Sequence, residues 1–478
     1  MTRLFRSSRP AFHRPVWPDR AMLWRWHFFA GLFCLPFVIV LCVTGSLYLF
    51  KPQIETWLDR DIDRAVAEGP PRSVSAQRDA ALSAVPGGHF LALEMPARKR
   101  QATRVLVAHG ADVTRVYIDP VTLRVMARRD EQTRFERLVF RLHGQLLIGN
   151  PGSAIMEMVA SWTLVLIVTG LMLWWPRRPG VGGTVLPRLG AKGRVFWRDL
   201  HAVGGMWISL ALILFLVSGL PWSFVWGSSF SAVERRIGRL VSVQDWEIGA
   251  VPIAATLSGH ATMPGMDMEA GAQPALPRPA ISRPAISRSV ISRAAISRAE
   301  MSGAAMRPEG LDAVYETARH LAFPAPVLVT PPVGEGEAWH IRSDTQNRPE
   351  RIEASVTAQG QVIHITRFAE KSLTDRLIGY GVAFHEGHLF GVLNLFLNLC
   401  VALLLTLASM AALMLWLRRR RPGHLDAPGA SPRRIGWGAL AVMGVMGGLL
   451  PELGISLLLL ALAGRFLGPR FSALRQKG

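Results

Sequence analysis

An apolar run of 23 residues, 28–50, follows the segment from Trp24 to His27 and contains no charged residue. A helix of that length extends about 34 Å, which is long enough to cross a bilayer. Residues 1–26 carry six Arg and a single acid, Asp19, and the cytoplasmic segments of membrane proteins are enriched in basic residues. We therefore predict an uncleaved membrane anchor with a cytoplasmic N-terminus and with His27 at the mouth of its helix.

The pattern around His27 recurs later in the chain. His201, like His27, has one Gly four residues after it and another eighteen residues after it; these glycines are Gly31, Gly45, Gly205 and Gly219. Eighteen residues make five helical turns, so each His shares a helix face with its distant Gly. A second pair, His143 and His385, has Gly at plus six (Gly149, Gly391) and Trp at plus thirty-one (Trp174, Trp416). The two patterns predict an internal duplication.

The composition indicates an integral membrane protein. Half of the 478 residues are hydrophobic, and the mean hydropathy is +0.25. The net charge of +20 is concentrated beside apolar runs, and no nucleic-acid motif accompanies it, so we expect no nucleic-acid partner. The three Cys also lie in apolar runs (Cys34, Cys42, Cys400). They provide neither a disulfide framework nor an attachment motif for c-type haem.

Three further apolar runs, 154–175, 201–226 and 392–416, give four predicted core spans, and basic segments follow the second and fourth of them. An apolar tail with Pro451-Glu452 at its centre favours a C-terminal hairpin of two short spans, with a re-entrant hairpin as the alternative. The predicted order is N-terminus and first span (1–51), external module (52–141), second span with an outer His segment (142–175), cytoplasmic loop (176–200), third span (201–226), second external module (227–381), fourth span with an outer His segment (382–417), cytoplasmic loop (418–434), and hairpin with tail (435–478).

The two external segments have the pattern of small α+β modules. In the first, we predict a helix over 74–85 and strands over 104–109, 113–118 and 123–128. In the second, we predict a helix over 311–321 and strands over 338–341, 351–358 and 361–368. Between them lies a low-complexity insertion, about 256–306, in which Arg recurs every five residues within Ile-Ser-Arg pentads. A five-residue step builds no continuous helix face, so this insertion is predicted to be a linker.

The predicted topology sorts the four histidines into two pairs. His27 and His201 begin outward-running helices at the cytoplasmic side, and His143 and His385 precede inward-running helices at the external side. A segment from His143 to Trp174 would be about 46 Å long as one helix, so we expect His143, and likewise His385, on a short segment at the outer surface. Paired imidazoles in a helical bundle suit a b-type haem, and one bundle could hold two haems. Gly31, Gly205, Gly45 and Gly219 would let the flat rings approach the backbone.

Other interpretations remain open at this point. A single interfacial His usually caps a helix or contacts lipid headgroups, and imidazoles also suit Cu, Zn and Fe in a metal-transport site. His388 lies one turn after His385 and is a possible substitute ligand. His260, Met263, Met266 and Met268 form a candidate soft-metal cluster, but they fall beside the linker, where chance clustering is the simpler explanation.

These motifs resemble the PepSY-associated transmembrane family. The matching stretches are Arg25–Gly31, Phe140–Gly149, Leu173–Arg177, Trp197–His201 and Phe384–Gly391. The resemblance implies a bacterial inner-membrane protein of several spans with PepSY-like external modules, related to ferrisiderophore reductases and iron-uptake proteins. It further implies a haem-dependent membrane reductase that uses these histidines as axial ligands and acts on ferric chelates in the periplasm.

The expected function is therefore a di-haem b electron-transfer protein that reduces a periplasmic ferric chelate. Because no flavin or nicotinamide motif is present, the electrons would come from quinol or from a separate cytoplasmic reductase. Two alternatives belong to other classes: a haem-free PepSY protein that binds peptides or regulates a peptidase, and a component of iron or copper transport.

Overall fold

The structure is a computed structural model that describes residues 18–110, 112–176, 180–220, 223–229, 309–332, 338–429 and 435–475. It divides into two compact units. The helical unit takes its described residues from 1–49, 139–236 and 390–478, and the sheet unit takes them from 50–138 and 237–389. The predicted linker and the His260 cluster lie outside the described residues.

Four long apolar helices form the core of the helical unit: α1 (Arg20–Leu49), α5 (Asn150–Trp174), α6 (Arg194–Gly219) and α12 (Val392–Arg419). Each is long and apolar enough to cross a membrane, and each corresponds to one predicted span. Three of them begin earlier than the apolar runs do, because the helix continues into polar residues at its N-terminal end. The chain is thus a multi-pass membrane protein.

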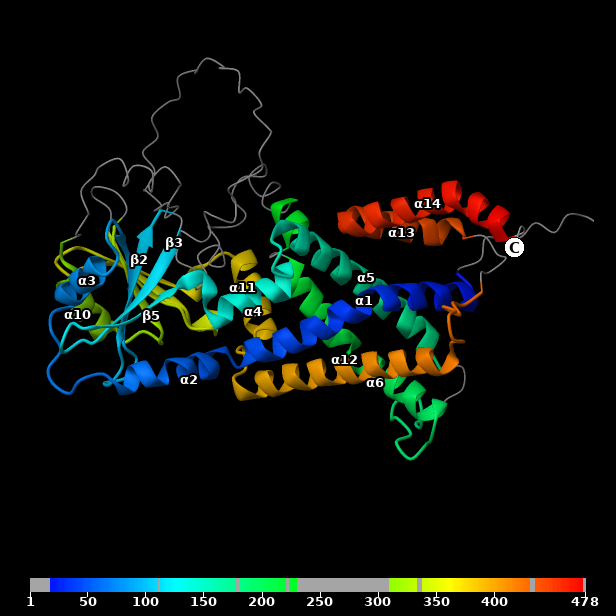
Figure 1. The fold of residues 1–478 in the computed structure, drawn as a ribbon, viewed down its shortest axis with the longest axis horizontal. Helices are drawn as coiled ribbons and strands as arrows, with labels where there is room; N and C mark the ends of the chain where they lie inside the picture. Colours follow the sequence, from blue (N-terminus) through cyan, green and yellow to red (C-terminus); the bar gives the residue numbers. More distant parts are fainter. Residues whose placement is uncertain are drawn as a thin grey trace, which may run out of the picture. The chain divides into compact units, whose positions relative to one another are not determined.

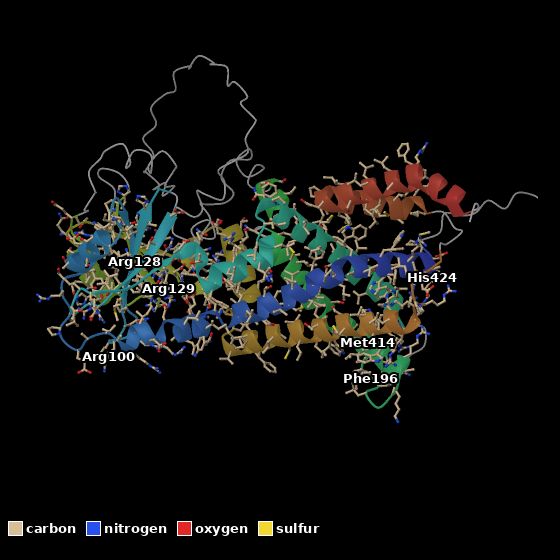
Figure 2. All side chains as sticks on the ribbon, in the orientation of Figure 1. Arg100, Arg128, Arg129, Phe196, Met414 and His424 are labelled. Atoms are coloured by element: carbon tan, nitrogen blue, oxygen red, sulfur yellow. The ribbon has the colours of Figure 1, made fainter. Side chains whose placement is uncertain are left out.

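The four helices run alongside one another in the helical unit (Figure 1). Helix α1 packs against α5 and α12, and α6 packs against the same two helices. Helices α1 and α6 therefore face each other diagonally. Figure 2 shows Phe196, near the start of α6, and Met414, near the end of α12, at the same end of the bundle, so these two helices are antiparallel.

The glycines six residues after His143 and His385 have a common structural role. Gly149 precedes α5 with φ 70° and ψ −141°, and Gly391 precedes α12 with φ 59° and ψ −137°. Only glycine adopts this backbone conformation readily. It separates each long helix from the shorter helix before it, which is α4 (Phe135–Gln145) or α11 (Leu373–His385). Short His-bearing helices before the spans are what the sequence predicts.

The C-terminal tail forms the helices α13 (Trp437–Leu449) and α14 (Pro451–Arg475), and α14 packs against α5. Gly447 and Gly454 bring the two backbones together, since a Cβ atom on Gly454 would lie 2.6 Å from the Gly447 carbonyl oxygen. Small residues permit such close approach in membrane helices.

The sheet unit contains one antiparallel sheet of eight strands in the order β4-β3-β2-β1-β5-β6-β7-β8. Each half of the chain contributes a helix followed by four strands. The first half has α3 (Val74–Ser83), β1 (His89–Glu94), β2 (Thr103–His109), β3 (Asp112–Ile118) and β4 (Val125–Asp130); the second has α10 (Leu311–Leu321), β5 (Val327–Thr330), β6 (Trp339–Ser343), β7 (Ile352–Val356) and β8 (Val362–Arg367).

The two halves share one sheet because β1 pairs with β5, with Leu93 opposite Val329 and Glu94 opposite Leu328. The sequence predicted both helices and six of the eight strands but missed β1 and β5. The prediction of two external α+β modules did not include this pairing, which joins the two halves in one sheet. The largest apolar cluster of the sheet unit includes Leu93, Trp339 and residues of both α3 and α10, so it draws on both halves of the joined sheet.

Helix α2 (Lys51–Arg64) also belongs to the sheet unit and was not predicted. Its Asp59 carboxylate receives hydrogen bonds from Arg104, Arg129 and Tyr117 of the sheet. Figure 2 labels Arg129 on this unit. The polar side chains therefore connect α2 to the strands β2, β3 and β4.

Candidate functional site

The rings of His27 and His201 approach each other across the helical unit. His27 comes from α1 and His201 from α6, the two diagonal helices, and their ring centroids are 5.9 Å apart at an interplanar angle of 67°. Both side chains are partly buried. The structure therefore brings one of the two predicted pairs together.

The hydrogen bonds around these rings fix their orientation. His27 Nδ1 lies 3.0 Å from the Thr169 hydroxyl of α5, and His201 Nδ1 lies 3.0 Å from the Ala408 carbonyl oxygen of α12. A carbonyl oxygen can only accept, so His201 Nδ1 carries the proton. The Thr169 hydroxyl donates its single hydrogen to the Val165 carbonyl, 2.6 Å away, so it accepts from His27 Nδ1.

His143 has the same arrangement at the other end of α1. Its Nδ1 atom lies 2.8 Å from the Thr44 hydroxyl, which donates to the Val40 carbonyl at 2.7 Å. Thr44 must therefore accept a hydrogen bond from His143 Nδ1. All three rings therefore donate a hydrogen bond through Nδ1. Metal-binding histidines commonly have this arrangement, in which a second hydrogen bond holds the ring and selects the tautomer.

The predicted packing glycines occupy different environments. A Cβ atom on Gly45 would lie 3.5 Å from His143 Cε1, whereas one on Gly31 would meet Leu166 at 3.7 Å. Gly205 has open space beside it, with no atom within 4 Å of such a Cβ, and Gly219 is the last residue of α6. Sequence reasoning missed Gly170, whose Cβ would lie 3.1 Å from His27 Cε1.

His385 and His388 belong to the sheet unit, where His385 is the last residue of α11 and His388 follows in a turn. The backbone N–H of His388 donates to the Ala383 carbonyl at 2.8 Å, and its Nε2 atom is buried. Burial lowers the pKa of His388, and nearby Lys51 lowers it further, although Glu386 opposes this change. The pairing of His385 with His143 stays a prediction from the sequence.

The tryptophans predicted at plus thirty-one hold the loops that follow two spans. The Trp174 indole N–H donates to the Thr184 carbonyl, and the Trp416 indole N–H donates to the Leu425 carbonyl, each at 3.0 Å.

Asp199, which the sequence analysis did not single out, lies two residues before His201 and is 1% exposed. It pairs with Arg188 and Arg198. These contacts fix the loop beside the His27/His201 pair.

The separation of the His27 and His201 rings can be compared with the spacing of two imidazoles that bind one metal ion. Two imidazoles that bind one metal ion from opposite sides, through bonds of about 2 Å, have ring centroids about 6 Å apart. The observed separation is 5.9 Å, and each ring has a hydrogen-bond partner at Nδ1. Within the parts of the chain that the structure describes, no three His, Cys, Asp or Glu side chains converge as a metal site.

Comparison with known families gives one match. The family model described as PepSY-associated TM region matches residues 24–419, which include all but the first residues of the four core helices, the sheet and all four predicted histidine ligands. No curated protein matches the chain.

Proposed function

The chain belongs to the PepSY-associated transmembrane family, and from this membership and the histidine geometry we propose that it is a haem b electron-transfer protein that reduces a ferric chelate. The observation that carries the proposal is the direction of three hydrogen bonds. In each case the ring donates through Nδ1, to Thr169, the Ala408 carbonyl and Thr44 respectively, as the supporting contacts of metal-binding histidines do. Histidines that only cap helices or contact lipid headgroups have no need to donate through a common ring nitrogen.

The proposed ligand pairs lie toward opposite ends of α1. His27 is near its start, and Thr44, which holds His143, is seventeen residues later, or about 26 Å along the helix axis. We assign His201 to the His27 centre and His385, from the sequence pattern, to the His143 centre. An electron would then cross most of the apolar layer by passing from one centre to the other.

Bound haem would supply the one-electron chemistry, and the polypeptide supplies axial ligands, position and polarity. Thr169 and the Ala408 carbonyl orient the rings of the first centre, and Thr44 orients His143 of the second. Gly45 and Gly170 leave room beside two of these rings. The apolar helices exclude water from the path between them.

The proposed substrate is a ferric ion held by a chelator of hard oxygen atoms. One electron converts Fe(III) to Fe(II), and the reduced ion binds such oxygen ligands more weakly because it is softer and carries less charge. The metal is therefore released without cleavage of the chelator. The electron donor would be quinol or a cytoplasmic reductase, and the membrane would be the bacterial inner membrane with the sheet unit in the periplasm.

Absorption spectroscopy of the detergent-purified protein tests this proposal. We expect a dithionite-reduced minus oxidised spectrum with b-type haem bands and up to two haems per chain. His27→Ala and His201→Ala should remove one haem, while His143→Ala and His385→Ala should remove the other. The matched control is His320→Ala, because His320 is an exposed residue of α10. Purified protein without haem bands, after reconstitution with haem, would reject the proposal in favour of a haem-free function.

A further inference from the structure

Three arginines lie on aromatic rings where α1 begins and α12 ends, within the helical unit. We call these arginines the α1–α12 basic patch: Arg25, Arg419 and Arg420. Arg419 of α12 lies over two rings of α1, with its guanidinium carbon 5.9 Å from the ring centroid of Trp24 and 5.4 Å from that of Phe28. The patch is therefore shared by two neighbouring helices, which pack against each other along the unit.

The other two arginines of the patch are stacked in the same way. Arg25 lies over the Phe29 ring at 5.2 Å, and Arg420 lies over the Trp416 ring at 5.0 Å. A guanidinium ion over an aromatic face is attracted to the ring electrons, while its N–H donors stay at its edge. Stacking therefore limits the motion of these side chains without using their capacity to donate hydrogen bonds.

The loop after α12 fixes the α1–α12 basic patch further. Arg25 donates to the Pro428 carbonyl at 2.9 Å, and Arg419 donates to the Asp426 carbonyl at 3.0 Å. Figure 2 labels His424 of this loop at the end of the helical unit. Because a guanidinium has five N–H groups, each of these two arginines keeps most of its donors after one such bond.

The positive charge of the patch is not neutralised by the described residues. The Asp426 carboxylate pairs with Arg421 at 3.0 Å, and within the described ranges no Asp or Glu forms an ion pair with any of the three patch arginines. Arg419 and Arg420 are exposed, and Arg25 is partly exposed. Several guanidinium groups side by side favour an anion with several oxygen acceptors, and phosphate is such a group.

Exposed apolar side chains beside the patch favour a lipid phosphate over a soluble one. Trp24 is 42% exposed, Phe29 is 39% exposed and Leu417 is 38% exposed. Phe29 follows Arg25 along α1 and Leu417 precedes Arg419 along α12, so both lie toward the apolar part of their helices. The acyl chains of a phospholipid cover such a surface while its phosphate reaches the arginines, whereas a free phosphate ion covers none of it.

We propose that the α1–α12 basic patch binds the headgroup of an anionic phospholipid in the leaflet next to the start of α1. Basic residues beside membrane helices attract anionic lipids, and each typically contributes about fivefold in affinity. The bound lipid connects Arg25 of α1 to Arg419 and Arg420 of α12. This inference goes beyond the proposed electron transfer and does not depend on haem.

Thermal unfolding of the full-length protein in mixed micelles tests the proposal. Protein in an uncharged detergent receives either phosphatidylglycerol, which is anionic, or phosphatidylcholine, which has no net charge, and circular dichroism gives the unfolding temperature. A ligand that binds only the folded state stabilises it, so we expect phosphatidylglycerol to raise the unfolding temperature of the wild type more than phosphatidylcholine does. Added salt should weaken this difference, because it screens the attraction.

Arg25→Gln and Arg419→Gln test the patch itself. Each variant should need about fivefold more phosphatidylglycerol for the same stabilisation. The two lipids are compared within each variant, so a general loss of stability from the missing stacking contact cancels. The matched control is Arg319→Gln, which removes one positive charge from an α10 side chain that is 60% exposed, and which should respond as the wild type does.

Native mass spectrometry of the same proteins measures the bound lipid directly. The wild type and Arg319→Gln should retain phosphatidylglycerol, and Arg25→Gln and Arg419→Gln should retain less of it. Equal retention and equal stabilisation in all four proteins would overturn the proposal. So would a wild type that inorganic phosphate stabilises as much as phosphatidylglycerol does at the same concentration, because the patch would then bind a soluble anion.

Discussion

The threonine hydroxyls that hold two histidine rings lead to a prediction about single side chains. Thr169→Val removes the acceptor for His27 Nδ1, and Thr44→Val removes the acceptor for His143 Nδ1, while each keeps the side-chain shape. Because such supporting contacts typically contribute 10- to 100-fold in metal affinity, we expect haem affinity to fall by about that factor at one centre in each variant. Titration of haem into the haem-free protein measures the effect.

Thr406→Val is the control for both threonine variants. The Thr406 hydroxyl donates to the Ala402 carbonyl at 2.8 Å and does not hold a histidine. Serine at position 44 or 169 should restore the affinity, since it keeps the hydroxyl. Unchanged haem affinity in Thr44→Val and Thr169→Val would show that the hydroxyls play no part in positioning the rings.

The histidines could be predicted from the sequence, but the residues that orient them could not. The four His stand out because their spacing to Gly and Trp repeats along the chain. Thr44 and Thr169 carry no such signal, since a threonine in a membrane helix usually bonds to the carbonyl four residues earlier, as these two also do. Their second role depends on which helix faces them, and this is a property of the fold.

At the scale of elements, the strand β3 carries a buried arginine whose loss should destabilise the sheet. Arg115 is 3% exposed and contacts Glu131 and Glu94. Removing one partner of a buried ion pair typically costs about 3–5 kcal/mol. We therefore expect Arg115→Leu to lower the thermal unfolding temperature of the sheet by several degrees, measured by circular dichroism on the full chain.

The effect of Arg115→Leu should depend on pH. Burial alone would raise the pKa of Glu131 and of Glu94, but Arg115 outweighs it and holds both below their usual values. These paired carboxylates stabilise the folded state above the pKa of the unfolded chain, and this contribution is lost as the pH falls through the folded-state pKa. The difference between wild type and Arg115→Leu should therefore narrow on acidification. A difference that stays constant down to acid pH would contradict this explanation.

The elements that the sequence missed are those that join larger parts of the molecule. Strand β5 has only four residues, and β1 has an irregular register between Phe90 and Ala92, so neither shows a regular alternation. Helix α2 has a Pro at its second position, which is a helix-start signal, but its polar composition hid it beside the apolar run. Local patterns predicted α3, α10 and the four core helices, because each has its own periodicity or length.

At the scale of the whole chain, the pairing of β1 with β5 restricts the topology. Strands that share backbone hydrogen bonds must lie in the same compartment, so residues 89–94 and 327–330 are on one side of the membrane. Between them along the chain are α5 and α6, each able to span a bilayer. Two crossings return the chain to the side from which it started. Strands β1 and β5 can therefore lie in one compartment, as their pairing requires.

Reporter fusions test this topology directly. A reporter after Arg60 in α2 and one after Gly360, in the turn between β7 and β8, should report the same external compartment. Fusions after Arg188 and after His424 should report the cytoplasm, because the loop 176–200 carries six Lys or Arg against one acid and Arg418–Arg421 are four consecutive arginines. If Arg60 and Arg188 were found on one side, α5 could not cross the membrane. The proposed pairing of His27 with His201 at one membrane face and of His143 with His385 at the other would then fail.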